Sequence, residues 1–175
     1  MKKFLLLVLI TTVFNNVRAQ RRGSEEKQSA FLGAAFELGL PSSSPISVGY
    51  GASLKGEIPF AQSLAATLTV GYMSYNYKDS FLSFAGTPQV LHPQFAPVKV
   101  GLRYEAGPGF YSEGELGEAI RLNNGSGSLF DYSVGLGFLV PVDRKSAVDF
   151  GIRYEAYSET QYRQTALRVA YRFGL

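Results

Sequence analysis

Apolar and polar side chains alternate along most of the chain after residue 29, in runs of about ten residues separated by turn-forming residues. Strict alternation over such a run is the pattern of a β-strand with one apolar face. No segment after residue 20 has the apolar spacing of an amphipathic helix. The pattern predicts eight strands, at about residues 30–40, 46–58, 63–77, 95–106, 109–121, 129–140, 146–157 and 165–175.

The connections between these runs alternate in length. Short turns follow the second, fourth and sixth runs, around residues 59–62, 107–108 and 141–145. Mostly longer connections follow the other runs, and the longest spans residues 78–94. An even strand number with turns at one end and longer loops at the other is typical of barrels in bacterial outer membranes. The sequence therefore predicts an all-β fold, an eight-stranded antiparallel up-and-down transmembrane β-barrel, with its turns toward the periplasm and its loops outside.

The two faces of each run differ in a way that favours a membrane over water. In residues 129–140 one face carries aromatic and aliphatic side chains, whereas the other carries aspartate, serine and glycine. A secreted soluble barrel is the alternative, but its solvated face would be rich in lysine and glutamate rather than in glycine and arginine. The apolar face is therefore expected to point toward lipid and the polar face toward the lumen.

Aromatic residues on the apolar face fall at two heights. Aliphatic residues lie between them, and the interfaces of a bilayer select this arrangement because amphipathic rings settle at the headgroup level. The expected periplasmic belt consists of Phe60, Tyr104, Phe110, Phe138 and Phe173, and the expected outer belt of Tyr50, Tyr72, Phe130, Tyr132 and Tyr154.

With this pattern, residues 30–175 resemble the family of small outer-membrane β-barrel-domain proteins of OmpA/OmpX-like, porin-like type. The resemblance is carried by the strand pattern, by the segment PVKVGLRY at 97–104 and by the closing AYRF at 170–173. The chain departs from the family in ending on Leu175, because the assembly signal usually ends on an aromatic residue. The resemblance implies outer-membrane lipid as the surrounding medium and the barrel-assembly machinery as a partner during biogenesis.

The first 29 residues form a separate region. Two lysines precede an eleven-residue apolar run at 4–14, and small side chains at Val17 and Ala19 stand before Gln20. This is the anatomy of a secretory signal peptide, and the run is too short to span a bilayer as a helix. We expect a signal peptide at 1–19, a polar periplasmic leader at 20–29 and the barrel domain at 30–175. The chain has no cysteine, which excludes a lipoprotein anchor and a disulfide framework.

The formal charge of +3 comes from the N-terminal region. Removal of residues 1–19 lowers Lys+Arg from 17 to 14, which equals the 14 Asp+Glu. A neutral mature chain gives no cationic surface for nucleic acid.

Charged residues on the polar face are expected to fill the barrel. An eight-stranded barrel is just wide enough for side chains to occupy its interior. Interleaved arginine–carboxylate pairs can satisfy one another there, and inward glycines would make room for long arginines. We favour a structural plug over the alternative, an ion-conducting lumen. The expected network comprises Glu37, Lys55, Glu57, Lys99, Arg103, Glu105, Glu113, Glu115, Arg121, Asp131, Asp149, Arg153, Glu155, Arg168 and Arg172.

The sequence offers little for catalysis, cofactors or metal ions. The single histidine, His92, lies in the long loop with Asp79, Ser80 and Ser83 nearby in sequence, and a loop histidine beside proline is usually structural. Glu113 and Glu115 share one face of a strand, but a plugged barrel would keep substrate away from them. Without cysteines or a histidine cluster, a metal site is not expected. No cofactor and no catalytic residue are predicted.

The long loop at 78–94 is where recognition would occur. Its apolar residues would either pack over the barrel mouth, which we favour, or contact a partner outside the cell. The leading hypothesis is a non-enzymatic integral outer-membrane protein that serves as a surface or envelope component, with loops for contact. The alternatives are a narrow pore or transport-linked protein and, third, a lipid-modifying membrane enzyme that uses His92.

Overall fold

The computed structural model describes residues 30–42, 46–78, 92–123, 127–158 and 162–175. The expected signal peptide at 1–19, the leader at 20–29 and most of the loop at 78–94 lie outside these residues. Within them, no helix is both long and apolar enough to cross a membrane.

Eight strands make up the described part of the chain, and all eight predicted strands are present. They are β1 (Phe31–Pro41), β2 (Ile46–Ala61), β3 (Leu64–Tyr77), β4 (Gln94–Gly107), β5 (Phe110–Arg121), β6 (Ser128–Pro141), β7 (Ser146–Tyr157) and β8 (Arg163–Gly174). The largest difference from the prediction is that β2 continues past Pro59 to Ala61. The β2–β3 ladder has a register shift between Pro59 and Ala61, and such an irregularity accommodates a proline because it has no N–H to donate.

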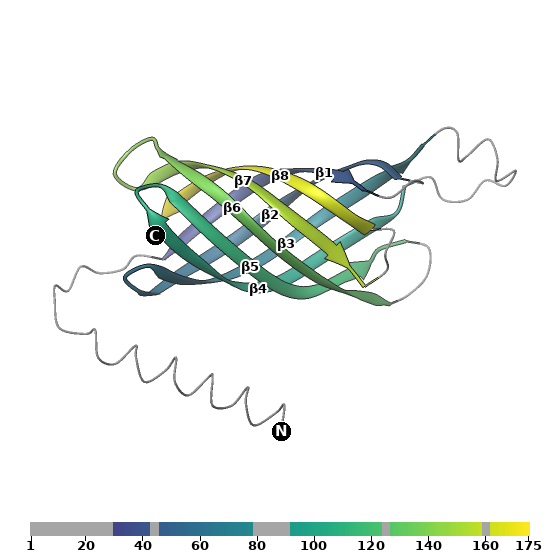
Figure 1. The fold of residues 1–175 in the computed structure, drawn as a ribbon, viewed down its shortest axis with the longest axis horizontal. Helices are drawn as coiled ribbons and strands as arrows, with labels where there is room; N and C mark the ends of the chain where they lie inside the picture. Colours follow the sequence, from purple (N-terminus) through teal and green to yellow (C-terminus); the bar gives the residue numbers. More distant parts are fainter. Residues whose placement is uncertain (1–29, 43–45, 79–91, 124–126, 159–161) are drawn as a thin grey trace, which may run out of the picture.

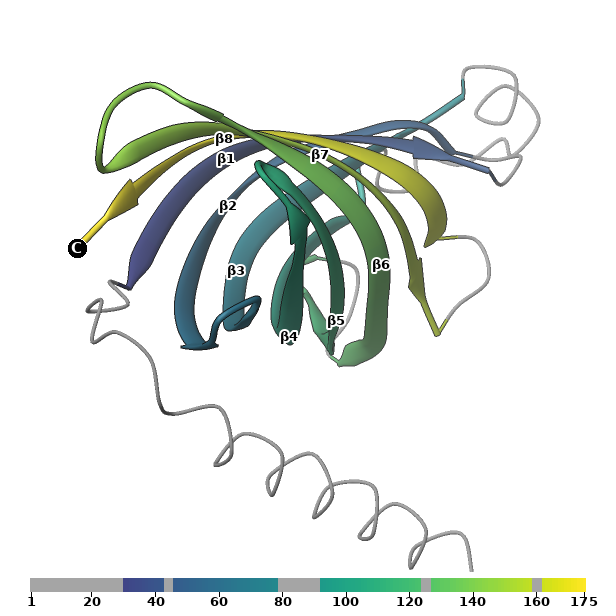
Figure 2. The ribbon, with the colours of Figure 1, turned by 60° about the vertical axis from the view of Figure 1, so that its left-hand side comes forward.

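Each strand pairs with its neighbour in sequence, and the sheet closes on itself (Figure 1). The closing ladder joins β1 to β8 in antiparallel register, from Phe31 opposite Gly174 to Pro41 opposite Gln164. The strands run obliquely around the barrel, as Figure 2 also shows. Closure leaves no unpaired strand edge, which a sheet within lipid requires because no water can satisfy its backbone. The fold class predicted from the sequence is confirmed.

The barrel has two different ends. Short turns join β2 to β3, β4 to β5 and β6 to β7 at the end where β1 begins and β8 finishes, which we call the turn end. Gly109 in the β4–β5 turn has φ of 81°, and a Cβ there would lie 2.8 Å from the carbonyl oxygen of Leu139. In the β6–β7 turn the Asp143 carboxylate accepts hydrogen bonds from the N–H groups of Lys145 and Ser146, which hold the pKa of Asp143 below its usual value. The opposite end, where the longer connections lie, is the loop end.

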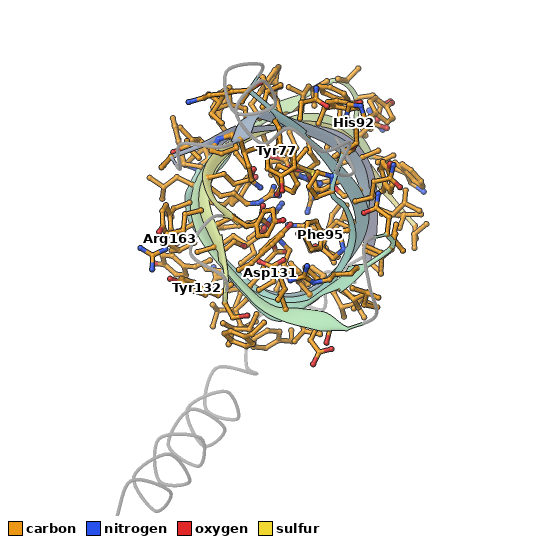
Figure 3. All side chains as sticks on the ribbon, turned by 90° about the vertical axis from the view of Figure 1, so that its right-hand side faces the viewer. Tyr77, His92, Phe95, Asp131, Tyr132 and Arg163 are labelled. Atoms are coloured by element: carbon orange, nitrogen blue, oxygen red, sulfur yellow. The ribbon has the colours of Figure 1, made fainter. Side chains whose placement is uncertain are left out.

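The exterior of the barrel is apolar and the interior polar. Large hydrophobic side chains on the outward face are extensively exposed, for example Val100 (61%) and Leu136 (63%). Figure 3, a view along the barrel from the loop end, shows Phe95 and Asp131 inside the wall and Tyr132 and Arg163 outside it. A continuous apolar exterior around a charged core is the arrangement for lipid, because a soluble barrel would bury the apolar face.

The ten aromatic residues expected in the two belts lie on the outward parity of their strands. The ring centroids of Phe110 and Phe138 lie 4.8 Å apart at the turn end, with the rings tilted, and those of Phe130 and Tyr132 lie 6.3 Å apart toward the loop end. Phe173 differs from the others because it is half-buried rather than exposed. Their role at the two membrane interfaces stays a prediction.

Candidate functional site in the barrel lumen

The lumen is the site at which inward-facing residues of all eight strands meet. Fourteen of the fifteen charged residues expected there are buried or half-buried. Glu105 is exposed at the turn end, because a register shift between Glu105 and Gly107 ends the regular β4–β5 ladder. Arg121 is half-buried near the loop end, with its guanidinium 5.9 Å from the ring centre of Phe95. The interior charges are therefore best described without these two residues.

Arg103 organises the half of the lumen nearer the turn end. It is 1% exposed, and its three nitrogens reach three carboxylates: Nη1 lies 3.0 Å from Glu57, Nε donates to Glu113 at 2.9 Å and Nη2 to Asp149 at 3.3 Å. Its guanidinium carbon lies 3.8 Å from the ring centre of Tyr111. A planar fork of donors is suited to this role, because several acceptors can be satisfied at once.

Two further arginines complete the charges around Arg103. Arg168 donates to Asp149 at 2.6 Å, and Arg172 donates to Glu57 at 2.6 Å. The Tyr111 hydroxyl donates to the other oxygen of Asp149 at 2.6 Å. We call Glu57, Arg103, Tyr111, Glu113, Asp149, Arg168 and Arg172 the Arg103 layer.

A second group of charges surrounds Lys99 nearer the loop end. The Lys99 ammonium pairs with Glu155 and lies 3.5 Å from Glu115 and 3.8 Å from Asp131. Arg153 donates to Glu37 at 2.5 Å, and its other terminal nitrogen lies 3.3 Å from Glu155. We call Glu37, Lys99, Glu115, Asp131, Arg153 and Glu155 the Lys99 layer.

Hydroxyl and amide donors supply the remaining hydrogen bonds of the Lys99 layer. Ser53 donates to Glu37 at 2.5 Å, Thr69 to Glu115 at 2.6 Å and Gln164 to Glu155 at 2.6 Å. Lys55 joins the two layers, because it pairs with Glu113 and lies 3.0 Å from Glu115. Glu113 and Glu115, which share one face of β5, are thus both held by lysine or arginine partners.

An aromatic cluster fills the lumen between the Lys99 layer and the loop end. The ring centroids of Phe95 and Tyr162 are 5.0 Å apart, those of Tyr75 and Phe95 6.0 Å, and the Tyr75 hydroxyl donates to that of Tyr157 at 3.3 Å. The cluster consists of Ile46, Met73, Tyr75, Phe95, Ala119, Leu129, Tyr157 and Tyr162.

Sequence reasoning missed this cluster, although the signal was present. Tyr75 has the parity of the inward Met73, Phe95 that of Lys99, and Tyr157 that of Glu155. The prediction assigned aromatic residues only to the lipid-facing parity, and these three rings have the opposite parity.

Inward glycines make room for arginines and also for rings: a Cβ on Gly135 would lie 2.6 Å from the Cβ of Arg153. A Cβ on Gly137 would lie 2.1 Å from the Tyr111 ring, and one on Gly49 would lie 2.6 Å from the Tyr75 ring. Beside Gly151, a cavity of about 20 Å³ is lined by Tyr111, Ser133, Arg153 and Arg168 among others. A space of this size can hold a water molecule but is not a continuous channel.

His92 lies at the rim of the loop end, apart from the charged layers. Its Nδ1 lies 2.7 Å from the side-chain amide oxygen of Asn76, which accepts a hydrogen bond, and its carbonyl oxygen accepts a hydrogen bond from the Asn123 side chain at 2.7 Å. Asp79, Ser80 and Ser83 lie outside the described residues. Among the described residues, no group of three or more histidine, aspartate or glutamate side chains is placed to hold a metal ion.

We expect His92→Ala to leave lipid composition unchanged, because among the described residues the imidazole Nδ1 contacts the amide oxygen of Asn76 and not a carboxylate that would orient it as a general base. Lipid profiles of expressing cells with the wild-type chain, with His92→Ala and with no chain are the measurement. A deacylated or transferred acyl product that depends on His92 would favour the enzyme hypothesis instead.

Comparison with known proteins finds no matching family model and no matching curated protein. Solved structures do match. Outer-membrane protein Ail of Yersinia pestis, in a phospholipid nanodisc, is 14% identical with a TM-score of 0.56, and the match covers 84% of this chain and 100% of that one. Outer-membrane protein AlkL in lipid bilayers is 10% identical with a TM-score of 0.54, and the match covers 88% of this chain and 93% of that one.

The N-terminal β-barrel domain of Pseudomonas aeruginosa OprF gives 15% identity and a TM-score of 0.51, with 83% of this chain and 98% of that chain covered. Identities of this size relate the folds and not the functions. With its closed sheet, apolar exterior and charged lumen, the chain has the fold of the small eight-stranded transmembrane β-barrels of bacterial outer membranes.

Proposed function

We propose that this chain is an integral protein of the bacterial outer membrane, exported by its signal peptide, and that it acts as a non-enzymatic envelope component. The observation that carries the proposal is the pairing of a lipid-compatible exterior with a lumen filled by two charged layers and an aromatic cluster. In such a barrel the interior side chains bind one another and so stabilise the wall. Its contacts with other molecules would then be made by the loops at the loop end.

A narrow pore is the second candidate. The cavity of about 20 Å³ lies in the lumen beside Arg153 and Arg168, and it marks a place where water could enter if the layers loosened. Its lining includes Tyr111 and Arg168 of the Arg103 layer and Arg153 of the Lys99 layer, so a water path along the lumen would have to break both layers and the aromatic cluster.

The proposal is tested by expressing the full chain and following it by heat-modifiability electrophoresis of detergent-extracted membranes. We expect the mature chain to begin at Gln20, to sediment with the outer membrane and to migrate differently before and after boiling, because a closed barrel resists detergent. A soluble chain, or one whose migration does not depend on boiling, would contradict the proposal.

The orientation can be measured in the same cells because the chain has no cysteine of its own. Ser128→Cys places a thiol at an exposed position of the loop end, and Arg144→Cys places one at an exposed position of the turn end. A membrane-impermeant maleimide should label position 128 on intact cells and position 144 only after lysis. The reverse pattern would place the loops in the periplasm and remove the case for external contacts.

A further inference from the structure

Asp131 is a buried carboxylate without the partners that the other lumen carboxylates have. It is 0% exposed, yet neither of its oxygens takes part in a hydrogen bond. The cation that the structure places against it is Lys99, at 3.8 Å, which also pairs with Glu155 and lies near Glu115. By contrast, both oxygens of Asp149 accept hydrogen bonds, from Tyr111 and from Arg168.

The charges buried below the aromatic cluster contain one more carboxylate than cation. Six cations occupy the two layers and their link: Lys55, Lys99, Arg103, Arg153, Arg168 and Arg172. Seven carboxylates face them: Glu37, Glu57, Glu113, Glu115, Asp131, Asp149 and Glu155. The hydrogen bonds identify Asp131 as the carboxylate in excess.

The groups around Asp131 cannot supply the missing charge. Glu155 and Arg153 on β7, Lys99 on β4 and Glu115 on β5 are the charged side chains that act on it most strongly. Both cations in this set are already engaged by glutamates. The nearby Tyr75 of β3 and Tyr157 of β7 bond to each other through their hydroxyls.

The described cations at the loop end are the exposed Lys78 and Arg163 and the half-buried Arg121, and none of them is among the charged groups that act most strongly on Asp131. Residues 43–45, 79–91, 124–126 and 159–161 contain Asp79 and Glu159 and neither lysine nor arginine. Arg121 lies over the Phe95 ring at the rim. A buried carboxylate without hydrogen bonds or a dedicated counter-charge is costly, so a compensating positive charge has to come from the medium.

We propose that Asp131 is a binding site for one small cation, a proton or an alkali-metal ion, which completes the neutralisation of the lumen beneath the aromatic cluster. This inference concerns the interior of the folded barrel and goes beyond the proposed function. The consequence is that the closure of the loop end depends on the medium. Removing the bound cation leaves an uncompensated carboxylate that draws water in among Tyr75, Phe95 and Tyr157.

The test compares the wild-type barrel, refolded in detergent, with Asp131→Asn and with Asp149→Asn as the matched control. Thermal unfolding is followed in mildly acidic and mildly alkaline buffers, each containing sodium, potassium or N-methylglucamine chloride at equal ionic strength. We expect the wild-type Tm to be lowest in the alkaline N-methylglucamine buffer. Recovery of Tm on acidification identifies a proton, and recovery on addition of sodium or potassium identifies an alkali-metal ion.

The two variants give opposite expectations. Asp131→Asn should lose most of this dependence on the medium and have a Tm at or above that of the wild type in the alkaline N-methylglucamine buffer. Asp149→Asn should have a lower Tm in every buffer but keep the dependence, because it removes a carboxylate that Arg168 and Tyr111 require. The proposal is overturned if Asp131→Asn keeps the full wild-type dependence, or if it lowers Tm as much as Asp149→Asn does.

A second measurement uses the wild-type chain and needs no variant to fold. Aspartate carboxyl carbons are labelled with ¹³C and followed by NMR while acidity and the alkali cation are varied. A buried carboxyl resonance that shifts on protonation or on addition of sodium or potassium, while that of Asp149 stays constant, supports the site. The proposal is overturned if no buried aspartate resonance shifts when acidity or the alkali cation is changed.

Discussion

Leu136→Arg should destabilise the folded barrel by about 2–4 kcal/mol, because it places a cation on the lipid-facing surface near the middle of the membrane. Leu136 is 63% exposed on the outward face of β6, midway between the two ends of that strand, and pairs with Ser112 and Ile152 of the adjoining strands. Val134→Arg, one outward position nearer the loop end, should behave in the same way. Reversible urea unfolding in lipid vesicles measures the loss.

Two variants control this comparison. Val142→Arg makes the same kind of change at an exposed position of the β6–β7 turn, beyond the apolar band, and should alter stability by no more than about 0.5 kcal/mol. Asp131→Ala removes a lumen carboxylate that has no hydrogen bond, so it should also cost less than Leu136→Arg. Equal losses at positions 136 and 142, or a larger loss at 131, would mean that the outward face of β6 does not contact lipid.

The strands could be predicted from the sequence because a barrel wall separates two media along its whole length. Every residue of β6 faces either lipid or lumen, so the alternation from Phe130 to Phe138 is uninterrupted. The prediction lost accuracy where the wall ends. Pro59 indicated a turn, yet β2 continues to Ala61 through an irregular register. Glu105 has inward parity but is exposed, at the last pair of the β4–β5 ladder before its register shifts.

The partners within the lumen could not be predicted, because parity fixes the face of a residue but not the height at which it meets others. Lys55 on β2 pairs with Glu113 on β5, and Arg103 on β4 reaches Asp149 on β7. These contacts cross the barrel, and their heights follow from strand tilt and stagger, which no local pattern reports. The same limit concealed the aromatic cluster, whose members come from several strands.

The charge excess at Asp131 is also a property of the assembled lumen. From the sequence, seven cations faced eight anions, and nothing distinguished one carboxylate from another. The structure leaves Glu105 exposed and Arg121 at the rim, and it gives Glu37, Glu115 and Glu155 hydroxyl, amide or guanidinium donors. What remains is Asp131, which has no hydrogen bond and whose ion-pair partner, Lys99, also pairs with Glu155; this becomes visible only when every hydrogen bond is assigned.

Arg103→Ala should lower the stability of the barrel by about 3–5 kcal/mol, because it leaves buried carboxylates without the cation that three of them share. Arg103 is 1% exposed and contacts Glu57, Glu113 and Asp149. Its removal would also leave the Tyr111 ring without the guanidinium stacked on it. Water entering to solvate these groups would reduce the loss and open the half of the lumen nearer the turn end. Thermal unfolding gives the stability, and planar-bilayer recording gives the conductance.

The wild type should show at most small and rare openings, because two charged layers and the aromatic cluster leave no continuous water path. Arg103→Ala should conduct more, and Arg103→Ala combined with Phe95→Ala more again, since the second change opens the aromatic cluster. Arg144→Ala, an exposed arginine of the β6–β7 turn, controls for the loss of a cation and should change neither quantity. Steady, large channels in the wild type would instead establish the narrow pore and make the same arginines its selectivity lining. An Arg103→Ala variant with unchanged melting and conductance would show that the charged layers do not close the lumen.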